Sequence, residues 1–431
     1  MTKIYLDHSA TTPMDKQVLN AMLPYFSGKF GNPSSIHGFG QVALAGVDAA
    51  REELSRFLNC NSEEVIFTSG ATESDNLAIN GVIKALKKPS FAPSDAKALA
   101  DKKAMAGKQG TKKEEMHIIT SLIEHDAVLE PLMDQETKGI KITRLPVKAN
   151  GVVDIEKFKK AIRDDTVLVS IMYVNSEVGS IQPISEIGKI IKNINEKRLK
   201  EWQKCRTAER GGRPQKIYFH TDATQAVNFL DCDVKRLRCD LLSLSGHKIY
   251  GPKGVGALFV KSGAPLNAVQ LGGHHERNLR SGTLNVPGIV GLGEAIRLLN
   301  KKSREAENKK IAELRDMLVN GIMKNIPNVI LNTDREISTP SHAHFSFLGV
   351  EGESILISLD LKGMAVSTGS ACASSSLKAS HVLLAMGIKP EIAHNSIRFT
   401  LGKQTTEAEI KKVIKILPPI IKRLRKMSPE H

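Results

Sequence analysis

Residues 216–251, KIYFHTDATQAVNFLDCDVKRLRCDLLSLSGHKIYG, contain two short apolar runs that each end in polar residues. The first run ends at Asp222, and the second leads to Lys248. The same pattern, an apolar run followed by polar residues and a helical stretch, recurs in residues 64–79, 116–132 and 166–179. Repeated units of this kind predict a mostly parallel α/β sheet. Because ligands bind at the carboxyl ends of strands in such sheets, the polar residues mark a predicted binding site.

The length of 431 residues predicts two domains, because it exceeds what one hydrophobic core usually serves. From Gly263 onward the pattern changes to long helices with short strands around AHFSFLG and MAVSTG, which is typical of an α+β unit. We therefore predict a large α/β domain of residues 16–262 and a smaller α+β domain of residues 1–15 and 263–431.

The net charge of +15 is concentrated in two segments. Residues 84–113 carry a net charge of +7 and residues 192–216 a net charge of +6, so the rest of the chain is nearly neutral. Phe91 and Trp202 are the only aromatic residues in the two segments, so aromatic side chains are not interleaved with the charges. We interpret them as solvated surface insertions, with a binding patch for an acidic partner as the alternative. Nucleic acid is not an expected partner on charge alone.

The five cysteines form no C-x-x-C pair and no arrangement with zinc-ligand spacing, and an odd number does not suit a disulfide framework. The chain has no amino-terminal signal region and no apolar run of about 18 residues. These features predict an intracellular protein that is not inserted in a membrane, with the cytoplasm as its expected compartment.

Cys372 lies in the segment VSTGSACASSSL, residues 366–377, among small and hydroxylated residues. A lone cysteine can be a small buried hydrophobic residue, a metal ligand or disulfide partner, or a reactive thiolate. The flanking serines and glycine offer little apolar area to bury. The context favours an exposed thiol on a mobile loop.

The segment FTSGATES places a strand end, Gly70, and a helix start at Ala71 and Thr72 next to one another. Free N–H groups at such a point suit a phosphate. The alternative is a simple helix cap in which Thr72 and Asp75 form a capping box. The G-x-x-x-x-G-K-[ST] pattern of a Walker loop is absent.

Asp222 and Lys248 extend this hypothesis from a phosphate to a whole cofactor. A carboxylate at the end of an apolar strand needs a cationic partner, and a protonated pyridine nitrogen would serve; a helix cap is the alternative. A desolvated lysine can form a Schiff base with an aldehyde, although a strand-end lysine is commonly a surface residue. Phosphate, pyridine nitrogen and aldehyde together describe pyridoxal phosphate.

The chain resembles the pyridoxal-phosphate-dependent cysteine desulfurases of the Isc/NifS type, class V of the fold-type I aminotransferases. The motifs that carry the resemblance are YLDHSATTP, FGNPSS, FTSGATESDN, TDATQ, SGHKIYGPKG, RSGT, VEGES, GSAC and SIRFTLG. They follow one another along nearly the whole chain outside the two basic segments.

The resemblance implies a role for each matching residue. Lys248 would carry the cofactor as a Schiff base, and His125 would stack on its ring and shuttle a proton. The residues implied for the phosphate are Ala71, Thr72, Ser245 and His247, with Thr283 reaching it from the partner subunit of a homodimer. The residues implied for the ring nitrogen and phenolic oxygen are Asp222, Gln225 and Asn175. Arg398 and Asn32 would hold the carboxylate of the substrate.

The resemblance also implies the reaction. L-Cysteine would become L-alanine, with its sulfur left as a persulfide on Cys372 and passed to iron–sulfur cluster assembly or tRNA thiolation. Cys372 would then be a transient iron–sulfur ligand shared with a scaffold protein. One alternative is a related class V selenocysteine lyase or aminotransferase, which needs Lys248 but no thiol at position 372. Another is a basic docking or nucleic-acid-binding module on an inert fold. For the compartment, the alternative to the cytoplasm is the matrix of a mitochondrion or a related organelle.

Overall fold

The computed structural model describes residues 3–87, 115–204, 214–299, 301–368 and 379–427. Its centre is a seven-stranded sheet with the order β2-β8-β7-β6-β5-β3-β4. The strands are β2 (Val65–Thr68), β3 (His117–Ser121), β4 (Lys141–Leu145), β5 (Thr166–Ser170), β6 (Tyr218–Asp222), β7 (Leu241–Ser245) and β8 (Gly256–Val260). Strand β8 is antiparallel to both neighbours, and the other pairs are parallel. The predicted mostly parallel α/β sheet is confirmed.

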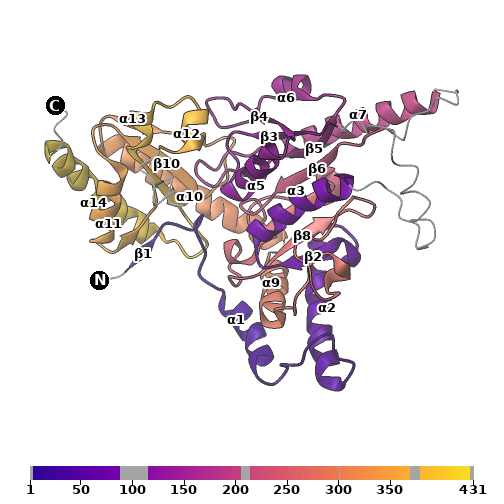
Figure 1. The fold of residues 1–431 in the computed structure, drawn as a ribbon. Coiled ribbons are helices and arrows are strands. Elements are labelled where there is room, and N and C mark those ends of the chain that lie inside the picture. Colours follow the sequence, from indigo (N-terminus) through magenta and orange to yellow (C-terminus); the bar gives the residue numbers. More distant parts are fainter. Residues whose placement is uncertain (1–2, 88–114, 205–213, 300, 369–378, 428–431) are drawn as a thin grey trace, which may run out of the picture.

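Helices cover both faces of this sheet, and this is why its central strands are buried on both faces without alternation. On one face lie α3 (Ala71–Lys87) and α5 (Asp126–Thr137), whose apolar side chains pack on β3 and β5. On the other face lie α2 (Gly38–Leu58), α7 (Ile184–Lys204) and α9 (Val286–Leu298), which share one core with the sheet. Figure 1 shows the helices around the sheet. The remaining elements near it are α1 (Lys16–Met22), α6 (Ile155–Ala161), α8 (Val234–Leu237) and the short 3₁₀ turns η1 (Leu23–Phe26), η2 (Ser62–Glu64), η3 (Gly246–Lys248) and η4 (Glu276–Asn278).

A second core lies beside the first, at the end where both chain termini are found (Figure 1). Its antiparallel sheet has the order β12-β10-β9, and β1 pairs with β11 in parallel. The strands are β1 (Ile4–Tyr5), β9 (Val329–Leu331), β10 (His342–Phe347), β11 (Met364–Ala365) and β12 (Ser396–Thr400). The helices are α10 (Lys301–Asn325), α11 (Gly352–Asp360), α12 (His381–Ala385), α13 (Pro390–Ala393) and α14 (Glu407–Met427).

The limits of the two predicted domains stay a prediction, and the packing of one helix bears on them. Helix α9 packs on α1 and α2, and its Ile289, Leu292 and Ile296 belong to the core of the large sheet. The amino-terminal Leu6 is instead fully buried in the second core. This packing favours a boundary after residue 298 instead of at residue 263.

Apart from residues 214–216, which precede β6 without regular structure, the described parts of the two basic segments are ends of helices. Residues 84–87 end α3, and residues 192–204 form the second half of α7. Residues 88–114 and 205–213 lie outside the described part of the chain. Arg198 fixes α7 to the sheet, since its guanidinium donates to the carbonyl oxygens of Arg163 at 2.6 Å and Gln215 at 2.9 Å. Within the described residues, no helix is both long and apolar enough to cross a membrane.

Candidate active site

The carboxyl ends of five strands meet at one edge of the large sheet and carry the predicted site residues. Strand β2 leads to the start of α3, and β3 leads to the loop before α5. Strands β5, β6 and β7 are adjacent in the sheet, with β6 ending at Asp222 and β7 leading directly into η3 and Lys248. The expectation that these segments converge is met by the strand order.

The turn at Gly70 is shaped to bring a helix start against the end of β7. Gly70 has φ +153°, and a Cβ atom built on it would lie 3.9 Å from the hydroxyl of Ser245. A Cβ atom at Gly256 of β8 would lie only 2.7 Å from the Cα of Gly70, so the turn packs directly on that strand. The first amides of α3, at Ala71 and Thr72, have no acceptor within the helix. These amides and the nearby hydroxyl of Ser245 are groups that can donate to an anion.

The capping-box alternative for this turn is wrong. Asp75 is fully buried and neither of its carboxyl oxygens has a hydrogen-bond partner. The side chain that bonds to the residues before α3 is instead that of Glu73. Its carboxylate accepts a hydrogen bond from the amide of Ser69 at 2.7 Å and pairs with Arg280 at 2.8 Å. Asp75 instead faces the interior of the sheet, where Nε2 of His220 lies 3.5 Å from it.

An amino-terminal strap, residues 7–12, crosses the lysine of η3. Nζ of Lys248 donates to the carbonyl oxygens of Ser9 at 2.5 Å and Ala10 at 2.7 Å. The amide Nε2 of Gln225 donates to the same Ser9 oxygen at 3.0 Å. Two predicted cofactor ligands therefore meet at one carbonyl group. The strap itself was recognised in the sequence only as a motif without a role.

His247 is tied to the same strap. Its Nδ1 lies 3.1 Å from the Thr11 hydroxyl, and its carbonyl oxygen accepts from the amide and the hydroxyl of Thr12. Burial, reinforced by the charges of Lys248 and Lys253, lowers the pKa of His247 to about 4. The ring is therefore neutral at physiological pH and can offer one donor and one acceptor.

Three buried carboxyl groups, those of Asp222, Asp75 and Glu124, interact electrostatically with one another. Asp222 is 7% exposed and accepts from the amide of Thr224 at 2.9 Å. Burial, with the charge of Asp222 next, raises the pKa of Asp75 well above its ordinary value. Burial also raises the pKa of Glu124 to about 8, against the hydrogen bonds from Ser121 and Met172. The raised pKa values favour the neutral forms of Asp75 and Glu124. A cationic group beside Asp222 would then face the charge of Asp222 without two further negative charges.

Replacing Glu124 with glutamine should reveal this buried acid through the pH dependence of stability. The unfolded carboxyl ionises near pH 4.5, whereas the folded one keeps its proton to about pH 8. The wild type therefore loses stability as pH rises through this window, and Glu124→Gln does not. The difference in unfolding free energy should grow by about 1.4 kcal/mol per pH unit in favour of the variant.

Urea unfolding of both proteins at several values between pH 5 and pH 8 measures this difference. Glutamine can still accept from the amide of Met172 and donate to the hydroxyl of Ser121, so the fold should tolerate it. Glu136→Gln is the control, because hydrogen bonding to Arg144 lowers the pKa of Glu136 and its effect should be constant over this range. Parallel stability curves for Glu124→Gln and the wild type would mean that Glu124 is ionised throughout.

His125 and Asn175 hold the two loops that flank these acids. His125 is the N-cap of α5, and its Nδ1 accepts from the amide of Ala127 at 3.0 Å, so a neutral ring carries its proton on Nε2. Asn175 accepts from the amides of Glu177 and Val178 and donates to the carbonyl oxygen of Ile123 at 3.0 Å. The helix-end interpretation of His125 and a cofactor role are compatible, because Nε2 does not make the capping bond.

Arg398 lies on β12, at the junction of the two cores. Its Nη2 pairs with Asp7 at 2.7 Å, and its Nη1 donates to the carbonyl oxygen of Ser176 at 3.0 Å. The residue is 5% exposed, and its buried Nε has no hydrogen-bond partner. The Ser9 hydroxyl donates to the same Ser176 oxygen at 2.7 Å. The strap of residues 7–12 therefore contacts both Arg398, through Asp7, and Lys248, through the carbonyl oxygen of Ser9.

Two predicted residues stand apart from this group in the described chain. Asn32 is exposed, and its side chain accepts from the amide of Ser34 in its own loop. Thr283 is exposed and follows Arg280, which is anchored to Glu73 at the start of α3. No hydrogen bond between described residues joins either side chain to Lys248 or Arg398.

Cys372 lies outside the described residues, but both flanks of its segment are held at the site. On the amino-terminal side, Ser367 pairs through its backbone with Arg398, at 2.7 and 3.2 Å. On the carboxyl-terminal side, the Ser380 hydroxyl donates to Glu177 at 2.6 Å, and Nε2 of His381 lies 3.0 Å from the carbonyl oxygen of Glu124. Among the described residues, no group of three or more metal-ligating side chains is arranged to hold a metal ion.

Comparisons with known proteins agree with this geometry. The family model of class-V aminotransferases matches residues 4–91, 100–199 and 203–413. The chain is 45% identical over 427 residues to the cysteine desulfurase IscS of Dictyoglomus turgidum, covering 99% of this chain and 96% of that protein. It is 43% identical over 426 residues to the IscS of Methanosarcina thermophila, covering 99% and 94%.

Solved structures show the same likeness. A NifS-like protein superposes with a TM-score of 0.83 at 34% identity, covering 98% of this chain and 100% of that one. SspA in complex with cysteine superposes with a TM-score of 0.73 at 33% identity, covering 94% and 100%.

Proposed function

The chain belongs to the class-V aminotransferase family, and from this premise we propose that it is a cysteine desulfurase that converts L-cysteine to L-alanine and retains the sulfur on Cys372. The observation that carries the proposal is the linkage of Lys248 and Arg398 through one strap, with both flanks of the Cys372 segment held beside them. An amine for a cofactor, a cation for a substrate carboxylate and a thiol are the three groups this reaction needs.

Pyridoxal phosphate is the cofactor of this family, and the residues present fit it. The turn at Gly70, which brings the first amides of α3 close to the hydroxyl of Ser245, suits the phosphate. Asp222, beside two neutral carboxyls, suits the ring nitrogen, and Lys248 suits the aldehyde. The residues proposed to hold the group are Lys248, Asp222, Gln225, Asn175, His125, Ala71, Thr72, Ser245 and His247, with Thr283 from a partner subunit. When bound, the cofactor supplies a sink for the electrons of the substrate's Cα.

The chain's own residues perform the other steps. Arg398 binds the carboxylate of L-cysteine, and Nε2 of His125 can hold or move a proton. The Cys372 thiolate then attacks the sulfur of the substrate: an S–S bond forms, the Cβ–S bond breaks, and a proton on Cβ completes L-alanine. The sum is L-cysteine plus enzyme thiol giving L-alanine plus enzyme persulfide, so no external oxidant is needed.

The proposal is tested by incubating the purified holoenzyme with L-cysteine and no other thiol. We expect alanine and an enzyme persulfide in a one-to-one ratio for the first turnover, seen by amino-acid analysis and intact mass. Adding a thiol reductant should release the sulfur as sulfide and allow further turnovers. Release of selenide from L-selenocysteine without an equivalent persulfide reaction on L-cysteine would favour the selenocysteine lyase alternative instead.

Replacing Arg398 with lysine should weaken substrate binding more than it slows turnover. Lysine keeps the charge but not the two-pronged geometry that matches a carboxylate. We expect the KM for L-cysteine to rise about 10- to 100-fold, equivalent to about 1.4–2.8 kcal/mol, with a smaller change in kcat. Steady-state kinetics measures both. Arg423→Lys, on α14, is the matched control and should leave KM unchanged.

We further propose that the enzyme is a homodimer. Large apolar side chains are exposed along residues 19–42 and near Thr283, including Ile36 at 94%, Phe30 at 65% and Leu271 at 76%. Exposed apolar surface of this kind is typical of a subunit interface. Its closeness in sequence to Thr283 and Asn32 supports the prediction that these two residues complete a site across the interface.

The acceptors of the sulfur remain part of the proposal. Iron–sulfur cluster assembly on a scaffold protein, with Cys372 as a transient cluster ligand, and tRNA thiolation are the proposed destinations. The cytoplasm is the proposed compartment. An inert binding module does not account for the arrangement of Lys248 and Arg398.

A further inference from the structure

A cavity of about 950 Å³ lies at the edge of the large sheet opposite the candidate active site. Tyr218 and Asp240, which line it, lie at the amino ends of β6 and β7, whereas Asp222 and Ser245 end the same strands. A five-residue strand separates the two edges by about 13 Å. Ligands at the two edges therefore do not share a pocket.

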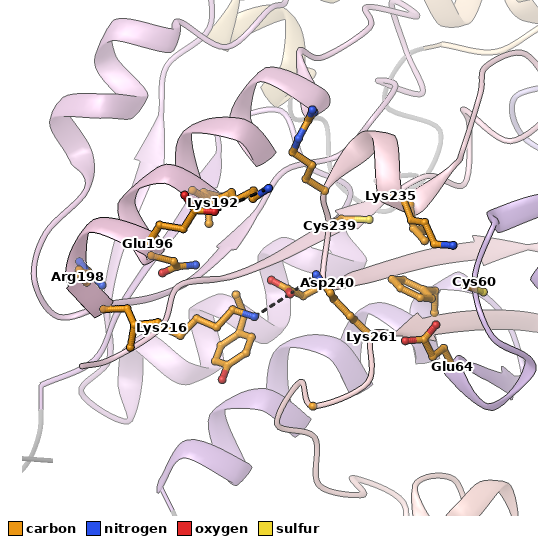
Figure 2. Close-up of a pocket in the computed structure, with 18 of the residues that line it drawn as sticks. Cys60, Glu64, Lys192, Glu196, Arg198, Lys216, Lys235, Cys239, Asp240 and Lys261 are labelled. Carbon is orange, nitrogen blue, oxygen red and sulfur yellow. Dashed lines mark hydrogen bonds and ion pairs between the residues drawn. The ribbon is translucent and has the colours of Figure 1, made fainter. Parts of the chain in front are cut away.

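Figure 2 shows how the charged side chains line this cavity. Residues of α7 stand on one side, Lys235 of α8 and Glu64 stand on the other, and Asp240 lies between them. The cationic lining residues are Lys192, Arg198, Lys216, Lys235, Arg238 and Lys261. The acidic ones are Glu64, Glu196 and Asp240. The lining therefore carries excess positive charge.

Two of the three carboxylates of the lining, those of Asp240 and Glu64, are already engaged. Asp240 is shared between Lys216 at 3.0 Å and Lys261 at 3.9 Å. Glu64 accepts from the amides of Ser262 at 2.7 Å and Asn61 at 2.9 Å. They have little remaining capacity to neutralise further cations, so the positive potential of the cavity persists.

Two cations of the lining contact neutral groups. Nζ of Lys235 lies 3.2 Å from the side-chain oxygen of Asn59, and Arg198 donates to main-chain carbonyl oxygens. Lys192 reaches Glu196 only at 3.8 Å on the exposed helix surface, where such a pair is worth little. An anion entering the cavity would meet ammonium groups that can reorient toward it.

The cavity also has an apolar wall. Its apolar and aromatic lining residues include Leu86, Ile191, Leu199, Val234, Tyr218 and Phe259. Nζ of Lys216 lies 4.6 Å from the centre of the Tyr218 ring. A cavity of this size, cationic on its rim and apolar on its wall, suits a phosphate carried on a flat organic body more than an inorganic anion.

The two basic segments of the sequence meet this cavity. The first leaves α3 at the cavity residue Leu86, and the second contributes residues 192–199 and 214–216 to the lining. Of the charged residues in these segments, Lys192, Arg198 and Lys216 line the cavity together with Glu196. The proposed desulfurase reaction uses none of these three cations, and the cavity lacks an assigned ligand.

We propose that this cavity binds a nucleotide, either free or at the end of an RNA strand, with its phosphate on the lysine rim and its base on the apolar wall. The binding is separate from desulfuration, because no residue of the lining is placed in the candidate active site. It does not depend on the identity of the reaction.

Binding is tested with the full-length holoenzyme by calorimetry at low salt, using AMP, ATP, inorganic phosphate and a short single-stranded RNA in separate titrations. We expect AMP or ATP to bind at least tenfold more tightly than inorganic phosphate. Tighter binding of RNA than of ATP would identify an RNA end as the source, and the reverse would identify a free nucleotide. Affinity should fall as salt is raised.

The discriminating variant is Lys192→Glu/Lys235→Glu, which changes two exposed lysines and leaves the Asp240 pairs intact. We expect nucleotide affinity to fall at least tenfold while persulfide formation from L-cysteine is unchanged. Lys411→Glu/Lys309→Glu is matched in charge and exposure. Lys411 pairs with Glu407, four residues before it, and Lys192 pairs with Glu196, four residues after it. This control should bind as the wild type does.

Three results would overturn the proposal. The first is no binding of AMP, ATP or RNA by the wild type at millimolar concentration. The second is equal loss of affinity in the test and control variants, since net charge alone would then explain it. The third is equal affinity for a polyglutamate peptide, which would show a general cationic surface without nucleotide chemistry.

Discussion

Lys248→Ala is expected to abolish conversion of L-cysteine to L-alanine, with a loss of about 10³-fold or more. The amine of Lys248 is the group that would join the cofactor covalently. It donates a hydrogen bond to the carbonyl oxygen of Ser9, which also accepts one from the side-chain amide of Gln225. Alanine removes both the covalent attachment and a proton carrier at the substrate's Cα. The remaining phosphate and Asp222 contacts should still allow weak, reversible binding of the cofactor.

A mass measurement separates this cause from simple misfolding. Borohydride treatment followed by peptide mapping should find a phosphopyridoxyl group on Lys248 in the wild type and on no peptide of the variant. Lys253→Ala, five residues away in the same SGHKIYGPKG motif, is the matched control and should keep both the label and the activity. A label that remains on another lysine in Lys248→Ala, with activity retained, would contradict the assignment.

The loss of two hydrogen bonds to the strap predicts a second, smaller effect. The ammonium of Lys248 donates to the carbonyl oxygens of Ser9 and Ala10. Without it, these carbonyls must find water, at a cost of about 1–3 kcal/mol. The cofactor-free variant should therefore melt a few degrees below the cofactor-free wild type, although its fold is otherwise retained.

The strand-end residues were predictable from the sequence because chain order alone determines where they go. Asp222 and Lys248 follow apolar runs directly, and parallel strands place their carboxyl ends at one edge. The pairing of β6 with β7 then brings these residues together without further information. The family motifs added the identity of the cofactor to this placement.

Long-range contacts of the strap and of Arg398 could not be predicted in the same way. Ser9 meets Lys248 across 239 residues of sequence, and Arg398 meets Asp7 across 391 residues. These contacts depend on how the second core sits beside the first, which apolar periodicity does not encode. The inward orientation of Asp75 was missed for a related reason: its spacing from Thr72 fits a capping box, and only the packing of α3 on β6 and β7 turns it toward His220.

A change of hydrophobic pattern along the sequence does not by itself show which core a helix packs into. Helical periodicity begins after Gly263, but α9 packs with α2 through Ile289 and Leu292 in the core of the large sheet. A Cβ atom at Gly293 would lie 2.6 Å from the Cβ of Ala50, so the two helices approach closely at small residues. Which helix α9 packs against depends on the shapes of the helix surfaces, and the hydrophobic pattern of the sequence alone does not reveal it.

Cys372→Ala is expected to retain the cofactor and lose the persulfide, which is the opposite pattern to that of Lys248→Ala. Cofactor absorbance and the borohydride label on Lys248 should be as in the wild type, because the contacts proposed to hold the cofactor do not include this thiol. Alanine and sulfide formation should fall about 10³-fold or more, since the variant lacks the thiol that is proposed to accept the sulfur from the bound substrate.

The other described thiols cannot replace Cys372, and their environments explain why. Burial raises the pKa of Cys60 and of Cys232 to about 12, and it raises the pKa of Cys239 further still. A thiolate is the reactive form, so these three side chains are almost fully protonated and unreactive at neutral pH. Cys60→Ala is therefore a suitable control and should form the persulfide at the wild-type rate.

Locating the persulfide by mass tests whether the segment with the anchored flanks carries the thiol that accepts the sulfur. Ser367 pairs with Arg398 on one side, and His381 contacts the carbonyl oxygen of Glu124 on the other. Cys372 is five residues from Ser367, so its Cα can lie at most about 18 Å from the Cα of Ser367. Peptide mapping after one turnover should place the extra sulfur on Cys372 alone. An equal yield of persulfide and alanine from Cys372→Ala would show that the sulfur leaves by a route that does not involve this segment.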